Sequence, residues 1–297
     1  MANIRTIAIT GASSGIGAAL TRALAADGHK LYVCARREDR LAEVTENGRL
    51  AKYMRVDVAC ENEVAGFAQM VEKDAGHVDV VICCAGSYGT IGPVCEVDAR
   101  LWWNSVEANL YGTFLTVQKF VYLLNGRPNA QIIGFSGGGA FNPLPRYSAY
   151  ATAKAGTVRL LETMAEELKP MGIAVNSVAP GFVKTEIHDA TLSVGPETAG
   201  GDFHAMTKAK LKRGAVPIEV PIECVRWLIS ASANTMTGKT ISASFDPWGS
   251  PEFVENIDAI NASDLYTMRR LNLVDLPPEQ YVDALSCAAK FEPKNPG

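Results

Sequence analysis

Residues 10–17 read Thr10-Gly11-Ala12-Ser13-Ser14-Gly15-Ile16-Gly17, a glycine-rich turn between a short apolar run and an amphipathic segment over residues 15–27. Such a turn at the start of a helix offers free backbone N–H groups and the positive end of the helix dipole to a phosphate. Glycine also lets the backbone approach a ligand closely. The stretch therefore predicts a dinucleotide-binding turn, spaced G-x-x-x-G-x-G rather than the generic G-x-G-x-x-G.

The rest of the chain alternates between apolar runs and helix-length amphipathic segments. Strands are predicted at Thr6–Thr10, Lys30–Cys34, Tyr53–Val56, Val78–Cys83, Gln131–Phe135, Ile173–Val178 and Thr240–Ala243. Further helices are predicted at 38–46, 61–74, 101–123, 148–168 and 221–231. Polar and apolar residues alternate little within these strands, which is typical of strands buried on both faces. The pattern predicts an α/β, Rossmann-like doubly wound fold, a seven-stranded parallel sheet with helices on both faces.

Two segments interrupt this alternation. Residues 186–218 hold several Gly, Pro and Thr residues, and we expect a mobile substrate lid with a short helix, in which His188 and His204 are solvated or gate the substrate. After a catalytic domain over residues 1–245, the proline-containing segment 246–297 is expected to pack on the domain or on a neighbouring subunit. Ser263 would cap a short helix in this extension, with Tyr266 and Arg270 on one face. A loose terminal segment is the alternative.

The composition of the 297 residues excludes several classes of function. A hydrophobic fraction of 47% and a charged fraction of 20% are ordinary for a globular domain. The net charge of -4, without a basic run, argues against nucleic acid or an anionic membrane as a partner. No apolar run resembles a signal peptide or a membrane span, so a cytoplasmic location is expected. The seven cysteines include no C-x-x-C pair, which indicates reduced thiols and no metal site.

Tyr150 and Lys154 stand four residues apart at the start of a predicted helix, so they share one of its faces. A nearby ammonium lowers the pKa of a tyrosine, which is about 10 when free, and prepares the phenol for acid/base catalysis. After the glycine-rich turn, this Y-x-x-x-K pair resembles the short-chain dehydrogenases/reductases (SDR). The resemblance covers residues 5 to about 245 and includes Asp57-Val58, Ala85-Gly86, Asn109 and Pro180-Gly181-Phe182-Val183-Lys184-Thr185.

The resemblance implies an NAD(P)-dependent oxidoreductase in which hydride passes from the nicotinamide to a ketone carbon while Tyr150 supplies the proton. Lys154 would hold the nicotinamide ribose, and Asn109 would bind a water in a proton relay linked to Lys154. The residues expected to contact the cofactor are Gly11, Ser13, Ser14, Gly15, Ile16, Gly17, Asp57, Val58, Ala85, Gly86, Tyr150, Lys154, Pro180, Gly181, Val183 and Thr185. The family is usually dimeric or tetrameric, so a homodimer or homotetramer is expected.

The chain departs from the family pattern at two places. The family has a serine thirteen residues before the tyrosine, where this chain has Gly137, and Ser136 precedes it in Phe-Ser-Gly-Gly-Gly-Ala. A one-residue shift of this glycine loop would bring Ser136 to the substrate oxygen, so Ser136 is predicted as the third catalytic residue. Cys83 and Cys84 replace two asparagines that precede Ala-Gly in the family, which affects local stability more than chemistry.

The end of the second strand bears on the choice of cofactor. It reads Val-Cys-Ala-Arg36-Arg37, and no acidic residue that would bind a ribose 2′-hydroxyl occurs before Glu38. Arg36 can form paired bonds to a 2′-phosphate, with help from Ser13 or Ser14, so NADP is predicted over NAD. The predicted function is NADP-dependent interconversion of a ketone and a secondary alcohol. The alternatives are NAD-dependent oxidation of a sugar or polyol hydroxyl, and a non-catalytic NADP-sensing regulator.

Overall fold

The structure is a computed structural model that describes residues 4–230, 233 and 235–269. These residues form one parallel sheet in the order β3-β2-β1-β4-β5-β6-β7. The strands are β1 (Thr6–Thr10), β2 (Lys30–Ala35), β3 (Lys52–Arg55), β4 (Val80–Cys83), β5 (Ala130–Phe135), β6 (Ile173–Ala179) and β7 (Thr240–Ser242). The predicted fold class is confirmed, and every predicted strand is present within two residues of its expected bounds.

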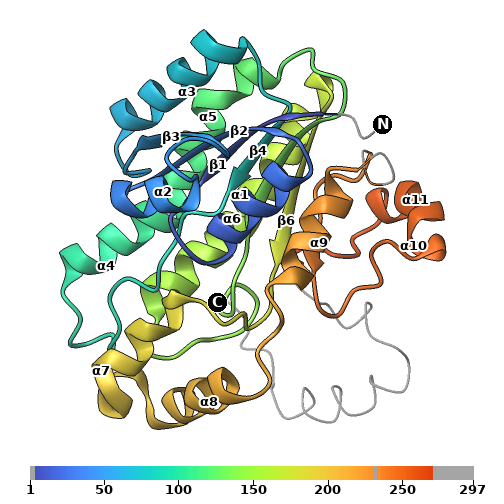
Figure 1. Cartoon of the computed structure of the whole chain (residues 1–297). Helices are drawn as coiled ribbons and strands as arrows, with labels where there is room; N and C mark the ends of the chain where they lie inside the picture. The colour runs from blue at the N-terminus through green and yellow to red at the C-terminus, as the bar shows by residue number, and fades with distance from the viewer. Residues whose placement is uncertain (1–3, 231–232, 234, 270–297) are drawn as a thin grey trace, which may run out of the picture. The chain divides into compact units, whose positions relative to one another are not determined.

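Helices cover both faces of the sheet (Figure 1). One face packs on α1 (Gly15–Ala26) and α9 (Glu219–Leu228), and the other on α3 (Glu61–Ala75), α5 (Gly112–Leu124) and α6 (Ser148–Leu168). In β1, Ile7 and Ile9 face the first of these cores and Ala8 faces the second. Burial on both faces explains why the strands show no polar alternation.

The predicted long helix over residues 101–123 is not continuous. It consists of α4 (Ala99–Val106), a π-helical turn η1 (Glu107–Tyr111) and α5. The short helix α2 (Glu38–Val44) follows β2 as expected. Single π-helical turns are rare and often lie at functional sites, and this one contains Asn109.

The segment over residues 186–218 contains more helix than the sequence indicated. A 3₁₀ turn η3 (Glu186–His188) is followed by α7 (Asp189–Ala199) and α8 (Gly201–Lys212), instead of one short helix. Gly195, with φ of 76°, and Pro196 kink α7, which is why the sequence resembled a loop. His188 is buried rather than solvated.

The described part of the extension packs along the edge of the sheet at β7. Helices α10 (Pro251–Glu255) and α11 (Ile257–Asn261) bury Phe253, Ile257 and Ile260 in the core that also contains α9. The backbone N–H of Thr240 in β7 donates to the carbonyl oxygen of Tyr266 at 2.8 Å.

The predicted helix that begins at Ser263 is wrong. The Ser263 hydroxyl, beyond the end of α11, donates back to the carbonyl oxygen of Ile260, and Tyr266 has a positive φ of 61°. Arg270 lies outside the described residues.

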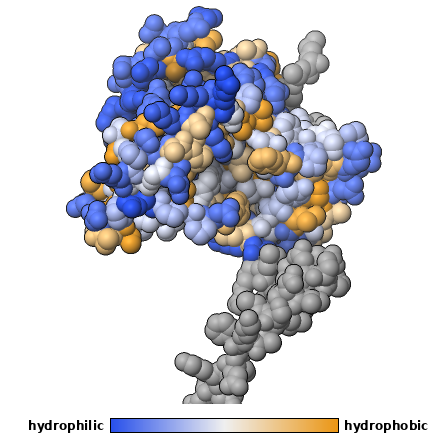
Figure 2. Space-filling model, turned by 90° about the horizontal axis from the view of Figure 1, so that it is seen from below, coloured by the Kyte–Doolittle hydropathy of each residue, from blue (hydrophilic) through white to orange (hydrophobic). Residues whose placement is uncertain are grey.

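One face of the molecule is mixed in polarity. Figure 2 shows one face, on which hydrophobic residues form separate patches among hydrophilic ones. Within the described ranges, no helix combines the length and the apolar character needed to span a bilayer.

Candidate active site

The turn after β1 folds tightly against the turn after β4. Gly11 has a φ of 73°, and a Cβ atom on it would lie 2.6 Å from the backbone of Ala85. A Cβ on Gly17 would lie 2.4 Å from the carbonyl oxygen of Gly11. Because any side chain would open this turn, glycine is required at both positions, and the N-terminus of α1 is left accessible to a phosphate.

A cavity of about 1280 Å³ runs from this turn to Tyr150. It is lined by the carboxyl ends of the strands and the loops that follow them, where ligands bind in doubly wound sheets. Every residue predicted to contact the cofactor lines it, Arg36 included. The glycine cradle at one end and the paired Tyr150 and Lys154 at the other fit an extended dinucleotide.

Arg37, rather than Arg36, reaches the glycine-rich turn. Its guanidinium donates to the hydroxyl of Ser14 at 2.6 Å and of Ser13 at 3.3 Å, and pairs with Glu186 at 2.9 Å. Within the described part of the chain, Arg36 makes no hydrogen bond, although it lines the cavity. The sequence pattern did not predict this role for Arg37. Its position next to Arg36 is the only feature of the sequence that indicates it.

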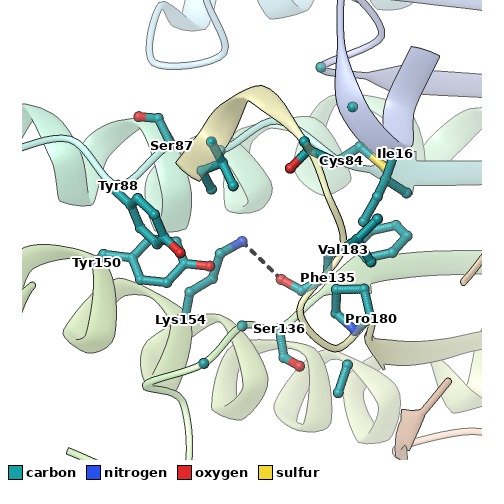
Figure 3. A pocket seen from close by; sticks show the side chains of 18 of the residues that line it. Ile16, Cys84, Ser87, Tyr88, Phe135, Ser136, Tyr150, Lys154, Pro180 and Val183 are labelled. Atoms are coloured by element: carbon teal, nitrogen blue, oxygen red, sulfur yellow. Dashed lines mark hydrogen bonds between the residues drawn. The ribbon is translucent and has the colours of Figure 1, made fainter. Parts of the chain in front are cut away.

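Tyr150 and Lys154 lie side by side on α6 (Figure 3). Lys154 Nζ donates to the carbonyl oxygen of Phe135 at 2.9 Å and is 5.8 Å from the centre of the Tyr150 ring. Burial raises the pKa of Tyr150 and lowers the pKa of Lys154 to about 8. The expectation that the ammonium lowers the tyrosine pKa is not met, because burial dominates. The phenol is therefore neutral, the form that can give away a proton.

Asn109 is fully buried in the π-helical turn and holds the loop after β4. Its side-chain amide donates to the carbonyl oxygens of Ser87 and Ser105, each at 2.9 Å, and accepts from the Ser87 N–H at 3.2 Å. A Cβ on Gly86 would lie 2.7 Å from Asn109 Oδ1 and 3.4 Å from Lys154 Nζ, so all three meet at one point. The water relay predicted for Asn109 stays a prediction.

Ser136 is not brought to Tyr150. Its N–H donates to the carbonyl oxygen of Val178 at 3.0 Å and its hydroxyl to the same oxygen at 3.4 Å, so the pairing of β5 with β6 continues through it. Figure 3 shows this hydroxyl directed away from the Tyr150 phenol. The predicted one-residue shift of the loop is absent, because the β5–β6 register fixes Ser136 and places Gly137 beside the phenol.

An aromatic cluster that the sequence did not reveal borders Tyr150. The Tyr88 ring meets Tyr150 edge-on at 4.9 Å and Tyr147 at 5.0 Å. His188 Nε2 lies 3.0 Å from the carbonyl oxygen of Val183 and must donate to it, so Nδ1 accepts from the Tyr88 hydroxyl at 3.2 Å. Burial lowers the pKa of His188 and favours this neutral form. The only sequence signal was the place of Tyr88 just after Ala85-Gly86.

The adjacent thiols of Cys83 and Cys84 are free. Burial raises the pKa of Cys83 to about 12 and also raises that of Cys84, so both remain protonated. Among the residues that the structure describes, no group of His, Cys, Asp and Glu side chains is arranged to hold a metal ion.

Comparisons with known proteins identify the family of the chain. A family model described as short chain dehydrogenase matches residues 5–193. A short-chain dehydrogenase/reductase of Armillaria gallica is 32% identical over 80% of this chain and 94% of its own length. A putative ketoacyl reductase of Streptomyces coelicolor is 32% identical over 79% of this chain and 93% of its own.

Solved structures are similar as well. A variant of actinorhodin polyketide ketoreductase with NADPH is 27% identical, with a TM-score of 0.71 over 82% of this chain and 97% of its own. Levodione reductase is 25% identical, with a TM-score of 0.71 over 82% of this chain and 98% of its own.

Proposed function

The chain belongs to the short-chain dehydrogenase family and is an NAD(P)-dependent oxidoreductase, and on this premise we propose that it interconverts a ketone and a secondary alcohol with NADP, using Tyr150 as the general acid/base. The observation that carries the proposal is the buried pair of Tyr150 and Lys154 at the end of the cavity opposite the glycine-rich turn.

The residues around the cavity have distinct roles in this proposal. The N–H groups of the glycine-rich turn bind the diphosphate, Lys154 binds the nicotinamide ribose, and Val183 and Thr185 border the nicotinamide. The bound cofactor supplies the hydride. The neutral phenol of Tyr150 gives its proton to the carbonyl oxygen as the carbon is reduced, and the Lys154 ammonium stabilises the phenolate that remains. Alcohol oxidation runs through the same contacts in reverse.

The preference for NADP is proposed from the charges near the glycine-rich turn. The guanidinium of Arg37 lies on Ser13 and Ser14, and Arg36 lines the same part of the cavity. A 2′-phosphate placed there meets two guanidinium groups and two hydroxyls, which are strong phosphate donors. The similar ketoreductase carries NADPH, which supports the proposal.

The lining of the cavity supports a ketone with a sizeable apolar part. Phe203 and Met206 of α8 line it, together with Tyr88, Phe182 and Leu144. We propose residues 186–218 as the substrate lid on this ground. Tyr266 and Thr267 also line the cavity, which supports a role of the extension in closing it. Apolar lining is poorly suited to a polyol, and the presence of both Tyr150 and Lys154 favours an enzyme over a regulator.

The proposal is tested with the wild-type protein and a panel of carbonyl compounds: cyclohexanone, acetophenone and a 3-oxobutanoyl thioester. Each is offered with NADPH and with NADH, and loss of the reduced cofactor is followed by its absorbance. We expect reduction of at least one ketone, with a higher kcat/KM for NADPH. A panel of polyols with NADP and NAD is the comparison, and turnover confined to polyols and NAD would contradict the proposal.

A further inference from the structure

Neither Ser136 nor Gly137, the two residues that directly follow β5, places a free hydroxyl in the position of the family's serine. A Cβ atom on Gly137 would lie 2.1 Å from the Tyr150 hydroxyl, so no side chain fits there without moving the phenol. The neighbouring Ser136 hydroxyl is buried and donates to Val178. A ketone bound against Tyr150 therefore lacks the usual hydroxyl donor from this loop.

The same loop has backbone N–H groups that can donate a hydrogen bond to a ligand. Residues 137–140 form a β-turn in which the Ala140 N–H donates to the carbonyl oxygen of Gly137 at 3.0 Å and Gly139 has a φ of 126°. The hydrogen bonds found in the described part of the chain leave the N–H groups of Gly137, Gly138 and Gly139 without an acceptor. All three residues line the cavity. Unpaired N–H groups on a cavity wall are costly unless water or a ligand accepts their hydrogen bonds.

Gly138 is the best placed of these donors. Its nitrogen belongs to the peptide that directly follows Gly137, whose backbone lies against the Tyr150 hydroxyl. Nothing lies within 4 Å of the position that a Cβ on Gly138 would occupy, so the space beside this peptide is open. A ligand bound against Tyr150 therefore has room beside Gly138 in the same cavity.

We propose that the peptide N–H of Gly138 donates a hydrogen bond to the carbonyl oxygen of the substrate, in the place that a serine hydroxyl would take. This inference rests on the proposed ketone reduction. As hydride adds to the carbonyl carbon, negative charge develops on the oxygen, and a fixed backbone N–H stabilises that charge without reorganising. The proton that completes the alcohol comes from Tyr150, and the Gly138 N–H is not transferred.

Position 138 allows a matched pair of variants. Gly138 is the second residue of the turn, where proline is favoured, and its φ is not positive. Gly138→Pro removes the N–H while the turn is kept, and Gly138→Ala keeps the N–H and adds a methyl group in open space. With NADPH and the ketone of the panel that is reduced fastest, we expect kcat to fall about 10²–10³-fold in Gly138→Pro, and the fall in Gly138→Ala, which keeps the N–H, to be at least about tenfold smaller. NADPH affinity and Tm should match the wild type in both.

A second variant covers the case in which the proline variant does not fold. Glycolic acid at position 138, introduced by nonsense suppression, replaces the N–H with an ester oxygen and adds no ring. We expect a loss of at least about tenfold in kcat, with the NADPH Kd unchanged. Wild-type kcat in the ester variant, or in a folded proline variant, would overturn the proposal.

Ser136→Ala completes the comparison. Because the Ser136 hydroxyl is bound to Val178, kcat should change by less than about threefold, whereas a loss near 10²-fold would make Ser136 the donor and overturn the role of Gly138. Failure of the underlying function would look different, since a Tyr150→Phe variant would then remain active whatever occupies position 138.

Discussion

The backbone of Gly137 lies so close to the hydroxyl of Tyr150 that a Cβ atom at residue 137 would be 2.1 Å from the phenolic oxygen. This contact fixes the phenol from one side, and the Tyr88 ring fixes it from another.

Gly137→Ala should therefore displace the proton donor. A shift of about 1 Å at a reacting group costs about 10²-fold in rate, so we expect a fall in kcat of that order with NADPH binding unchanged. Steady-state kinetics and fluorescence titration with NADPH measure both quantities, with Gly66→Ala in α3, where an added Cβ makes only ordinary contact, as the control. Wild-type kcat in Gly137→Ala would show that the phenol tolerates the displacement.

The second prediction concerns cofactor choice. Arg37→Ala removes the guanidinium that lies on Ser13 and Ser14, so KM for NADPH should rise about 10–100-fold while KM for NADH changes little. Arg36→Ala, in which the lost side chain makes no hydrogen bond in the described structure, is the matched comparison and should have the smaller effect. If neither variant altered the ratio of the two KM values, these arginines would not be the residues that recognise the 2′-phosphate of NADPH.

The third prediction concerns Tyr88 and His188. Tyr88→Phe keeps the ring contacts but leaves the buried Nδ1 of His188 without its donor, which should lower the free energy of unfolding by about 1–3 kcal/mol. Urea unfolding measures this change. Tyr122→Phe, whose hydroxyl bonds to Glu72 at the surface, should change it by less than about 1 kcal/mol. Equal effects would mean that the Tyr88–His188 bond contributes nothing specific.

The fourth prediction uses the buried charge of Lys154. Its pKa is about 8 in the folded protein and 10.5 in a free side chain, so between these values the unfolded chain binds a proton that the folded chain does not. Stability contributed by this group therefore rises with pH across that window. Relative to Lys154→Met, the wild type should gain about 2 kcal/mol of unfolding free energy between about pH 7.5 and 9.5. Subtracting the variant cancels the cysteines and tyrosines that titrate nearby, and a difference that stayed flat or fell would contradict the assignment.

Much of the fold could be predicted from the sequence because its strands are apolar on both faces. The glycine spacing of the first turn also indicates a tight backbone turn at the start of a helix. All of the predicted cofactor contacts line one cavity for the same reason: the loops after parallel strands gather at one edge of the sheet.

The remaining features depend on pairings that no local pattern contains. The place of Ser136 is decided by the register of β5 against β6, and a slip of one residue reverses which face a side chain occupies. Tyr88 meets His188 across 100 residues of chain. Ser263 has the composition of a helix start, but no helix follows it: its hydroxyl donates back to Ile260 and accepts from the Leu265 N–H, and Tyr266 has a positive φ.

The account depends most directly on Tyr150 as the proton donor, and one comparison of two tyrosines tests it. Tyr150→Phe removes the hydroxyl from the cavity, while Tyr147→Phe removes a buried hydroxyl of the same helix region that donates to Thr191. The measurement is kcat for NADPH-dependent ketone reduction, with NADPH Kd determined alongside. We predict a loss of at least about 10²-fold in Tyr150→Phe with Kd unchanged, and near-wild-type turnover in Tyr147→Phe. Near-wild-type kcat in Tyr150→Phe would contradict the account.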